Sequence, residues 1–172
     1  MDLLLVILFA ASVTLDNVVI AQVSALPVTR LVIISAPAHV LMLAGGSLLA
    51  PSLALAVPSL AHWLTPCLFT VLGVASLWSM RHHRQHPETT SMMATVALCF
   101  LLASDALLLG LSPAVAANLG PVAVGVVLFT SAFVLLGRVI RRGGAPVLGR
   151  IGFVEAAVFF GLAIHSWLVA GA

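Results

Sequence analysis

Six apolar stretches, each close to the length of a helix that crosses a bilayer, cover almost all of this chain. They run over about residues 3–25, 31–50, 60–80, 91–112, 119–140 and 151–171. Only 7% of the 172 residues are charged and the mean hydropathy is +1.25, whereas soluble domains carry about 25% charged residues. We therefore expect one all-α integral membrane domain over residues 1–172, with six transmembrane helices in a lipid bilayer.

The placement of the arginines predicts how these helices are oriented. The chain has no lysine, and every arginine lies at the end of the first, third or fifth apolar stretch or after it, on one side of a six-helix bundle: Arg30, Arg81, Arg84, Arg138, Arg141, Arg142 and Arg150. Because basic loops stay in the cytoplasm, both termini are expected on the outer face of a bacterial plasma (inner) membrane. The pI near 9 then reflects topology, and no nucleic-acid partner is expected.

The two halves of the chain share a weak pattern. A shift of 89 positions places Asp16 on Asp105, and each aspartate lies within an apolar stretch. The segment Gly73–Trp78 also matches Gly161–Trp167, with the glycines aligned at a shift of 88 and the tryptophans at 89. The match is weak residue by residue but keeps the same order along the chain, which indicates an internal repeat.

Each half contains three helices, so the second half would enter the membrane upside down. The first repeat covers about residues 1–80, a cytoplasmic linker about 81–90, and the second repeat about 91–172. Inverted repeats of this kind are typical of secondary transporters, which bind their substrate between the repeats near the bilayer midplane.

Asp16 and Asp105 are the main candidates for a functional site. A carboxylate at membrane depth costs roughly 2.5 to 3.5 kcal/mol, so its presence calls for a reason. Two carboxylates could neutralise one divalent cation, with neutral oxygens from Asn17 and Ser104, and oxygen ligands suit Mg, Ca and Mn. Protons on the same carboxylates would give metal/proton exchange. Alternatively, the aspartates accept hydrogen bonds from hydroxyls and hold helices together.

Other polar residues leave two interpretations each. His39 lies inside the second stretch, either as a packed, hydrogen-bonded residue or as a metal ligand or proton relay. Glu155 lies about one turn into the sixth stretch and either reaches back to water or borders the ion path. His82, His83 and His86 form either a solvated linker or a loop that collects metal.

Several motifs are missing from the sequence. It has no phosphate-binding loop, no His-Glu-x-x-His and no Gly-x-Ser-x-Gly, so neither ATP-driven pumping by this chain alone nor a conventional hydrolase is expected. Cys67 and Cys99 form no Cys-x-x-Cys pair and are expected to be small packing residues. We expect no enzyme activity and no resident cofactor.

Short motifs in the chain resemble those of the MntP manganese efflux pumps of the LysE/TerC superfamily. Ala103–Gly110 is similar to their fourth-helix motif, and Thr14–Ala21 is similar to a first-helix motif shared with the TerC group. Leu136–Arg138 and the sixth stretch around Gly161 are also similar, so the resemblance covers most of the chain. It implies secondary export of Mn²⁺, with the membrane aspartates of helices 1 and 4 carried over to Asp16 and Asp105.

The chain departs from that family at four places. His39 stands seven residues before Gly46, where the family usually has a glutamate; Asn17 replaces an alanine. Glu155 stands where an apolar residue is expected, and the linker is rich in histidine rather than acidic residues. An imidazole in place of a carboxylate makes a site less negative and softer, which brings zinc, cobalt, nickel and cadmium into consideration.

The sequence therefore predicts a secondary-active exporter of a divalent cation, with Mn²⁺ favoured as the transported substrate. Its predicted metal ligands are Asp16, Asp105, Asn17, His39, Glu155 and Ser104. One alternative is a LysE-like exporter of an amino acid or small organic solute, whose ammonium the aspartates could bind. Others are a CcdA-like thiol relay, which would need paired cysteines, and a non-transporting membrane subunit. A homodimer would suit so small a transporter, although no interface signature is present.

Overall fold

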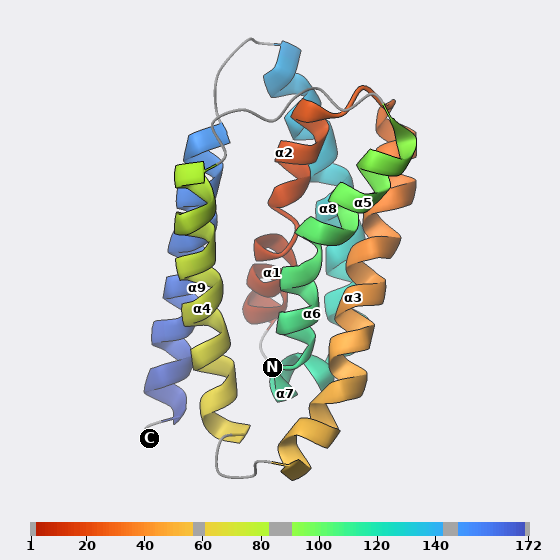
Figure 1. Ribbon diagram of the computed structural model, residues 1–172. Helices are drawn as coiled ribbons and strands as arrows, with labels where there is room; N and C mark the ends of the chain where they lie inside the picture. Colours follow the sequence, from red (N-terminus) through yellow and green to blue (C-terminus); the bar gives the residue numbers. More distant parts are fainter. Residues whose placement is uncertain (1–2, 57–60, 83–90, 143–147, 171–172) are drawn as a thin grey trace.

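The computed structural model describes residues 3–56, 61–82, 91–142 and 148–170, and these ranges contain helices and no strand (Figure 1). Four helical segments are long and apolar enough to cross a membrane: Val6–Val23, Val28–Leu53, Met92–Gly110 and Leu119–Arg142. Two shorter apolar helices cover Trp63–Trp78 and Phe153–Leu168. The expectation of an all-α membrane protein is confirmed for the described residues, in which four helical segments are long and apolar enough to cross a membrane.

Helix occupies each of the six apolar stretches, and two of the stretches are interrupted. The first holds α1 (Leu3–Ser12) and α2 (Asp16–Val23), and the fourth holds α5 (Met92–Leu102) and α6 (Ser104–Gly110). The others are continuous: α3 (Val28–Ala56), α4 (Ala61–His82), α8 (Leu119–Arg142) and α9 (Leu148–Ala170). A single turn, α7 (Pro113–Ala116), connects α6 to α8.

Local hydrogen bonds explain the first interruption. The amides of Asn17 and Val18 bond to carbonyls three residues back, both at 3.0 Å, instead of four back. The Thr14 hydroxyl donates to the Ala10 carbonyl at 2.8 Å. Side chains of this type compete with the helical ladder for backbone groups, and the tighter spacing ends one helix and starts another. Asp16 is consequently the first residue of α2.

The second interruption is a single residue. Ala103 has φ −78° and ψ 3°, outside the α-helical region, and its carbonyl accepts from the Ala106 amide at 3.1 Å. Asp105 therefore lies in the first turn of α6, just as Asp16 lies in the first turn of α2. Each interruption thus places an aspartate at the start of a half-helix.

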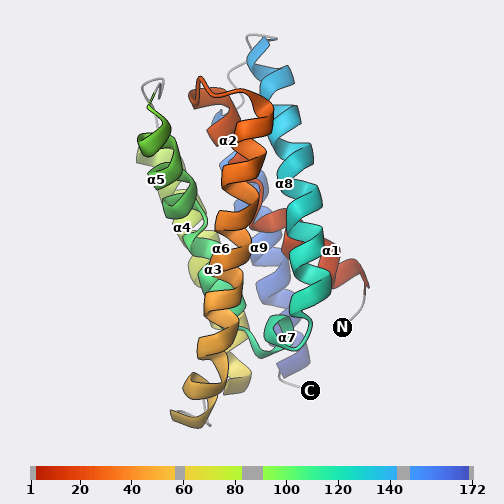
Figure 2. The same cartoon turned by 90° about the vertical axis from the view of Figure 1, so that its right-hand side faces the viewer.

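The helices pack in two groups. α4 and α9 pack mainly on each other and form a pair on one side of the molecule, olive and blue in Figure 1. In the other group α3 packs on α6, α2 on α8, and α3 on α8. Figure 2 shows α3 between α5–α6 on one side and α8 on the other. Only α1, α2, α6 and α7 provide connections of any extent between the groups.

Glycines allow two of these helix pairs to approach closely. A Cβ on Gly46 of α3 would lie 2.9 Å from the Cα of Gly110 on α6, and a Cβ on Gly110 would lie 3.0 Å from the Ser47 amide nitrogen. A Cβ on Gly137 of α8 would lie 2.7 Å from the Cβ of Ala21 on α2. Small residues at such crossings bring backbones into contact, which stabilises helix pairs in a membrane.

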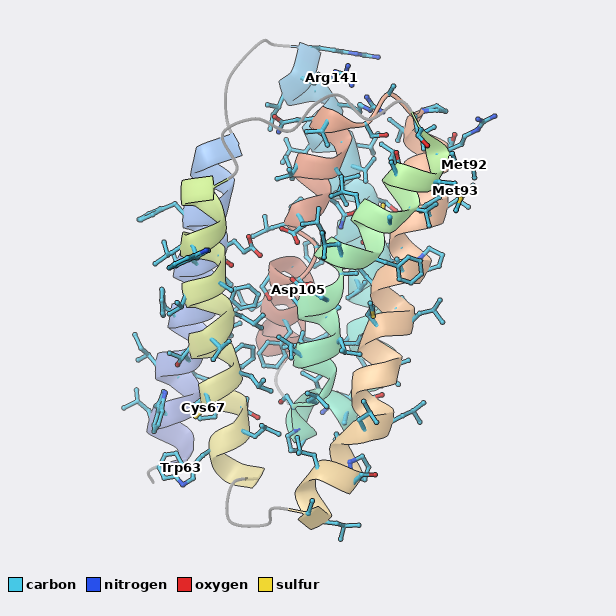
Figure 3. The ribbon with its side chains drawn as sticks, viewed as in Figure 1. Trp63, Cys67, Met92, Met93, Asp105 and Arg141 are labelled. Atoms are coloured by element: carbon cyan, nitrogen blue, oxygen red, sulfur yellow. The ribbon has the colours of Figure 1, made fainter. Side chains whose placement is uncertain are left out.

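The arginines of α8 bind the far end of α2. Arg138 Nη1 donates to the Ser24 carbonyl at 3.0 Å, and its Nη2 donates to the Leu26 carbonyl. Arg141 Nη1 donates to the same Ser24 carbonyl at 2.8 Å. Figure 3 places Arg141 at the upper end of the bundle and Trp63 at the lower end, toward which the chain termini lie. These guanidinium groups satisfy carbonyls where α2 ends.

Replacing Gly110 by valine is expected to separate α3 from α6. The added side chain meets backbone atoms that cannot rotate away, and overpacking of this kind costs at least about 1–3 kcal/mol. The detergent-solubilised variant should melt at a lower temperature than wild type and elute as a broader peak in size-exclusion chromatography. Gly161→Val is the matched control, because a Cβ there meets nothing within 4 Å. Equal melting temperatures for the two variants would contradict this packing.

Candidate metal centre

Three carboxylates from three helices meet in the interior of the bundle. Asp16, Asp105 and Glu155 each offer a carboxylate oxygen, and these oxygens all lie within 4.8 Å of one another. Asp105 is 9% exposed and Glu155 8%, and Asp16 is half-buried. Figure 3 shows Asp105 about midway along the bundle. Carboxylates this close, away from bulk water, require a cation or protons between them.

One carboxylate oxygen of the cluster, on Asp105, has no hydrogen-bond partner among the described residues. Asp105 Oδ1 accepts a hydrogen bond from the Ala106 amide at 2.7 Å, whereas its Oδ2 is buried and accepts none. A buried carboxylate oxygen without a donor is costly, so it is suited to coordinate a cation. The donor set around it consists of oxygens, which fits a hard divalent ion.

The cluster lies on a cavity of about 220 Å³ between the two groups of helices. The remaining lining residues come from α4, α5, α6 and α9: Leu72, Ala75, Ser76, Leu101, Leu102, Ser104, Leu108 and Phe159. Three of them are exposed, Ala75, Leu101 and Ser104, so the cavity reaches the surface beside the break between α5 and α6. A hydrated cation could enter there.

A stack of three phenylalanines lies beside the cavity, and one of them, Phe159, lines it. The ring centroids of Phe9 and Phe69 lie 5.2 Å apart, and those of Phe69 and Phe159 lie 6.4 Å apart. All three side chains are buried, and they come from α1, α4 and α9. Phe159 follows Glu155 by one helical turn and Phe9 precedes Asp16 by two turns. The stack therefore separates the carboxylates from the end of the bundle that carries the termini.

Four of the six predicted ligands line this cavity. Asp16, Asp105 and Glu155 form the carboxylate cluster, and Ser104 contributes an exposed hydroxyl beside it. Glu155 lies about two turns into α9, one turn deeper than the sequence indicated. Its carboxylate is buried in the cluster and does not reach back to water.

The other two predicted ligands lie elsewhere. Asn17 and His39 are fully buried, but neither lines the cavity and His39 is not part of the carboxylate cluster. His39 Nδ1 lies 2.9 Å from the Ser35 carbonyl, and Ser35 donates its hydroxyl to Asn17 Oδ1. These residues form a separate polar group between α2 and α3.

Ser76 and Phe159 belong to the cavity although the sequence did not single them out. Ser76 donates its hydroxyl to the Leu72 carbonyl at 3.0 Å and lies beside the Glu155 carboxylate. The sequence offers one weak indication of its role, because Ser76 falls within the segment Gly73–Trp78 that matches Gly161–Trp167 in the second half. Nothing in the sequence indicates that α4 faces Glu155.

The histidine-rich linker and the cysteines lie away from the cavity or outside the described residues. His82 is the last residue of α4, and His83 and His86 lie outside the described residues, so the idea of a metal-collecting loop stays a prediction. Cys67 is exposed and Cys99 is buried, and both are free thiols. Neither lines the cavity.

The chain matches no protein-family model, no curated protein and no solved structure. The function therefore has to be inferred from the geometry of the carboxylate cluster.

Asp105→Asn is expected to change how the protein responds to cations. The amide keeps an oxygen for the Ala106 bond but removes one of three crowded negative charges, so the variant should melt at a higher temperature than wild type in a chelator. Mn²⁺ at a hundred times its Kd should stabilise wild type by about 2.7 kcal/mol and the variant far less. Thermal unfolding in detergent measures both effects. A Mn²⁺ shift of equal size in both proteins would place the ion elsewhere.

Proposed function

We propose that this chain is a secondary-active exporter of a divalent metal cation, most favourably Mn²⁺, which binds between Asp16, Asp105 and Glu155. The observation that carries the proposal is the convergence of three carboxylates on one buried cavity, each from a different helix. Membrane-buried ionisable groups facing a cavity typically mark an ion pathway.

The donor atoms favour a hard cation. Among the described residues, the cavity is lined by carboxylates and by the hydroxyls of Ser76 and Ser104, with no imidazole or thiol. Such oxygen ligands suit Mn²⁺, Mg²⁺ and Ca²⁺ better than Zn²⁺ or Cd²⁺. The position of His39 outside the cavity removes the reason to favour softer metals. The MntP resemblance then favours Mn²⁺ within the hard group.

The arrangement of helices supports two inverted three-helix repeats with six crossings. Both interrupted stretches start a half-helix at their aspartate. The contact of α3 with α6 at Gly46 and Gly110 corresponds to the contact of α8 with α2 at Gly137 and Ala21. The third helices of the two halves, α4 and α9, pack on each other. Discontinuous helices at a repeat interface are a common design of secondary transporters.

The basic end of the bundle gives the proposed orientation. The described arginines occur where α3 and α9 begin and where α4 and α8 end, at the end of the bundle opposite the termini. By the positive-inside rule this end faces the cytoplasm of a bacterial plasma membrane. The cavity is then closed toward the outside by the phenylalanine stack and reaches the surface beside Leu101, one turn from Asp105 on the cytoplasmic side.

Alternating access would move one helix group against the other. Glu155 belongs to the α4–α9 pair, and both aspartates belong to the other group, so a bound cation bridges the two. Rocking of the pair would open the stack of Phe9, Phe69 and Phe159 and close the entrance beside Ser104. Release outside follows when protons or water replace the cation.

Export of an amino acid is less well supported. Such a substrate needs a partner for its carboxylate as well as its ammonium group. None of the described residues that line the cavity is an arginine or lysine, and three are acidic. A substrate carboxylate would be repelled by this site unless it bound at a helix N-terminus.

Cellular metal content tests the proposed function. Cells that express wild type should hold less manganese than control cells under manganese load, with little change in zinc or cadmium. Asp16→Asn, Asp105→Asn and Glu155→Gln should each slow efflux at least about tenfold at equal membrane expression, since each removes one of the negative charges that would hold the cation. Ser131→Ala is the control, because this serine bonds only to its own helix at Val127. If no metal falls, the cation proposal fails and amino-acid efflux becomes the better hypothesis.

Thiol labelling tests the proposed orientation. In a Cys67→Ser background, Ser104→Cys should react with a membrane-impermeant maleimide in inside-out vesicles but not in intact cells. Cys99 remains in place because it is buried. Mn²⁺ should slow the labelling, since position 104 lies on the cavity beside the carboxylates. Labelling of intact cells from outside would mean that the proposed orientation is reversed, or that the phenylalanine stack leaves the cavity open to the outside.

A further inference from the structure

A second buried polar group lies between α2 and α3, next to the cavity but not on it. It consists of Asn17, Ser35 and His39, each 0% exposed. Three polar side chains buried in the apolar interior of a membrane protein need a reason for being there. None of them offers an atom to the carboxylate cluster.

The hydrogen bonds of this group lead from the continuous helix α3 to the interruption before α2. His39 Nδ1 bonds the Ser35 carbonyl at 2.9 Å, and because a carbonyl can only accept, Nδ1 carries the proton. Ser35 donates to Asn17 Oδ1, and Asn17 Nδ2 donates to the Thr14 carbonyl at 2.9 Å. The imidazole also lies against the backbone of Val13. The contacts therefore end in the turn of residues 13–15.

This turn determines where Asp16 points. An interruption in a membrane helix exposes backbone groups that must find partners within the protein. The Asn17 side-chain amide donates a second hydrogen bond to the Thr14 carbonyl, which also accepts from the Asn17 backbone amide, and Ser35 holds the Asn17 side chain in place. In the tight turn each residue rotates the chain by about 120° about the helix axis, whereas in regular α-helix it rotates the chain by about 100°. If the three residues of the turn became regular α-helix, α2 would therefore rotate about its axis by roughly 60°. Asp16 would then leave the cluster.

The corresponding interruption in the second half is held differently. Counterparts at a shift of 89 positions are Ala106, Val124 and Leu128, none of which has a polar side chain. Asp105 is instead fixed by its own bond to the Ala106 amide. The side-chain group is thus specific to Asp16.

We propose that Asn17, Ser35 and His39 are positioning residues, which hold the interruption between α1 and α2 so that Asp16 faces Asp105 and Glu155. They set the affinity of the site for its cation without contacting it. This inference rests on the proposed function, because it assigns these residues to the same site.

Mn²⁺ transport kinetics in proteoliposomes test the effect on affinity. Ser35→Ala removes the donor to Asn17 and should raise KM for Mn²⁺ about tenfold, equivalent to about 1.4 kcal/mol, with the maximal rate per folded protein unchanged. Ser131→Ala, which removes a hydroxyl bonded only within α8, should leave KM as in wild type. An unchanged KM, or a fall in maximal rate alone, would overturn the proposal.

A cross-linking experiment tests the geometry without transport. Asp16→Cys and Glu155→Cys, in a Cys67→Ser background, should react efficiently with a short bis-maleimide because the native carboxylates meet. Adding Ser35→Ala should lower the yield severalfold, and adding Ser131→Ala should not. An equal yield in both would overturn the positioning role. If wild type neither binds nor moves Mn²⁺ yet the yield falls, the proposed function fails while the positioning of residue 16 stands.

Discussion

Repulsion among three carboxylates is the constraint on which the rest of this structure depends. At a separation near 4.8 Å, two unit charges in a partly hydrated protein interior repel by roughly 3 kcal/mol, and here there are three such pairs. The packing of apolar helices alone does not offset this repulsion energy, so the carboxylates need a local environment that stabilises their charge. The interrupted helices reduce this repulsion, because Asp16 and Asp105 lie in the first turns of α2 and α6, where the helix dipole favours negative charge. Glu155 has no helix start nearby and depends on the cation or on protons.

The same repulsion would give a bound cation a structural role. The α4–α9 pair has few contacts with the other helices, and the Glu155 carboxylate repels the two aspartates unless a cation or protons neutralise them. A divalent cation would therefore attract the pair toward the bundle, and its loss would let the pair move away. The phenylalanine stack also spans the two groups, since Phe9 belongs to one and Phe69 and Phe159 to the other. Cation binding and the packing of the stack would thus be coupled through the same pair of helices.

Sequence reasoning located the charges but not the faces on which they lie. The cost of a membrane carboxylate was enough to select Asp16, Asp105 and Glu155, and the apolar stretches were enough to place the helices. The location of Asn17 was not predicted in this way. Asn17 follows Asp16 directly and was therefore expected at the same site, but its side chain lies elsewhere. Successive residues on a helix point about 100° apart, so Asn17 faces Ser35 of α3 while Asp16 faces the cavity. The phase of α2 depends on the interruption before it, which depends in turn on contacts with α3.

The third carboxylate stands on a helix pair that has few contacts with the rest of the bundle. Glu155 belongs to α9, which packs mainly on α4, whereas α3 packs closely on α6 and α8. At the core of the bundle α3 instead carries His39, an imidazole bonded to its own helix and in contact with the turn before Asp16. A cation ligand on the loosely attached pair would make cation binding and helix movement a single event, which a ligand on α3 would not do.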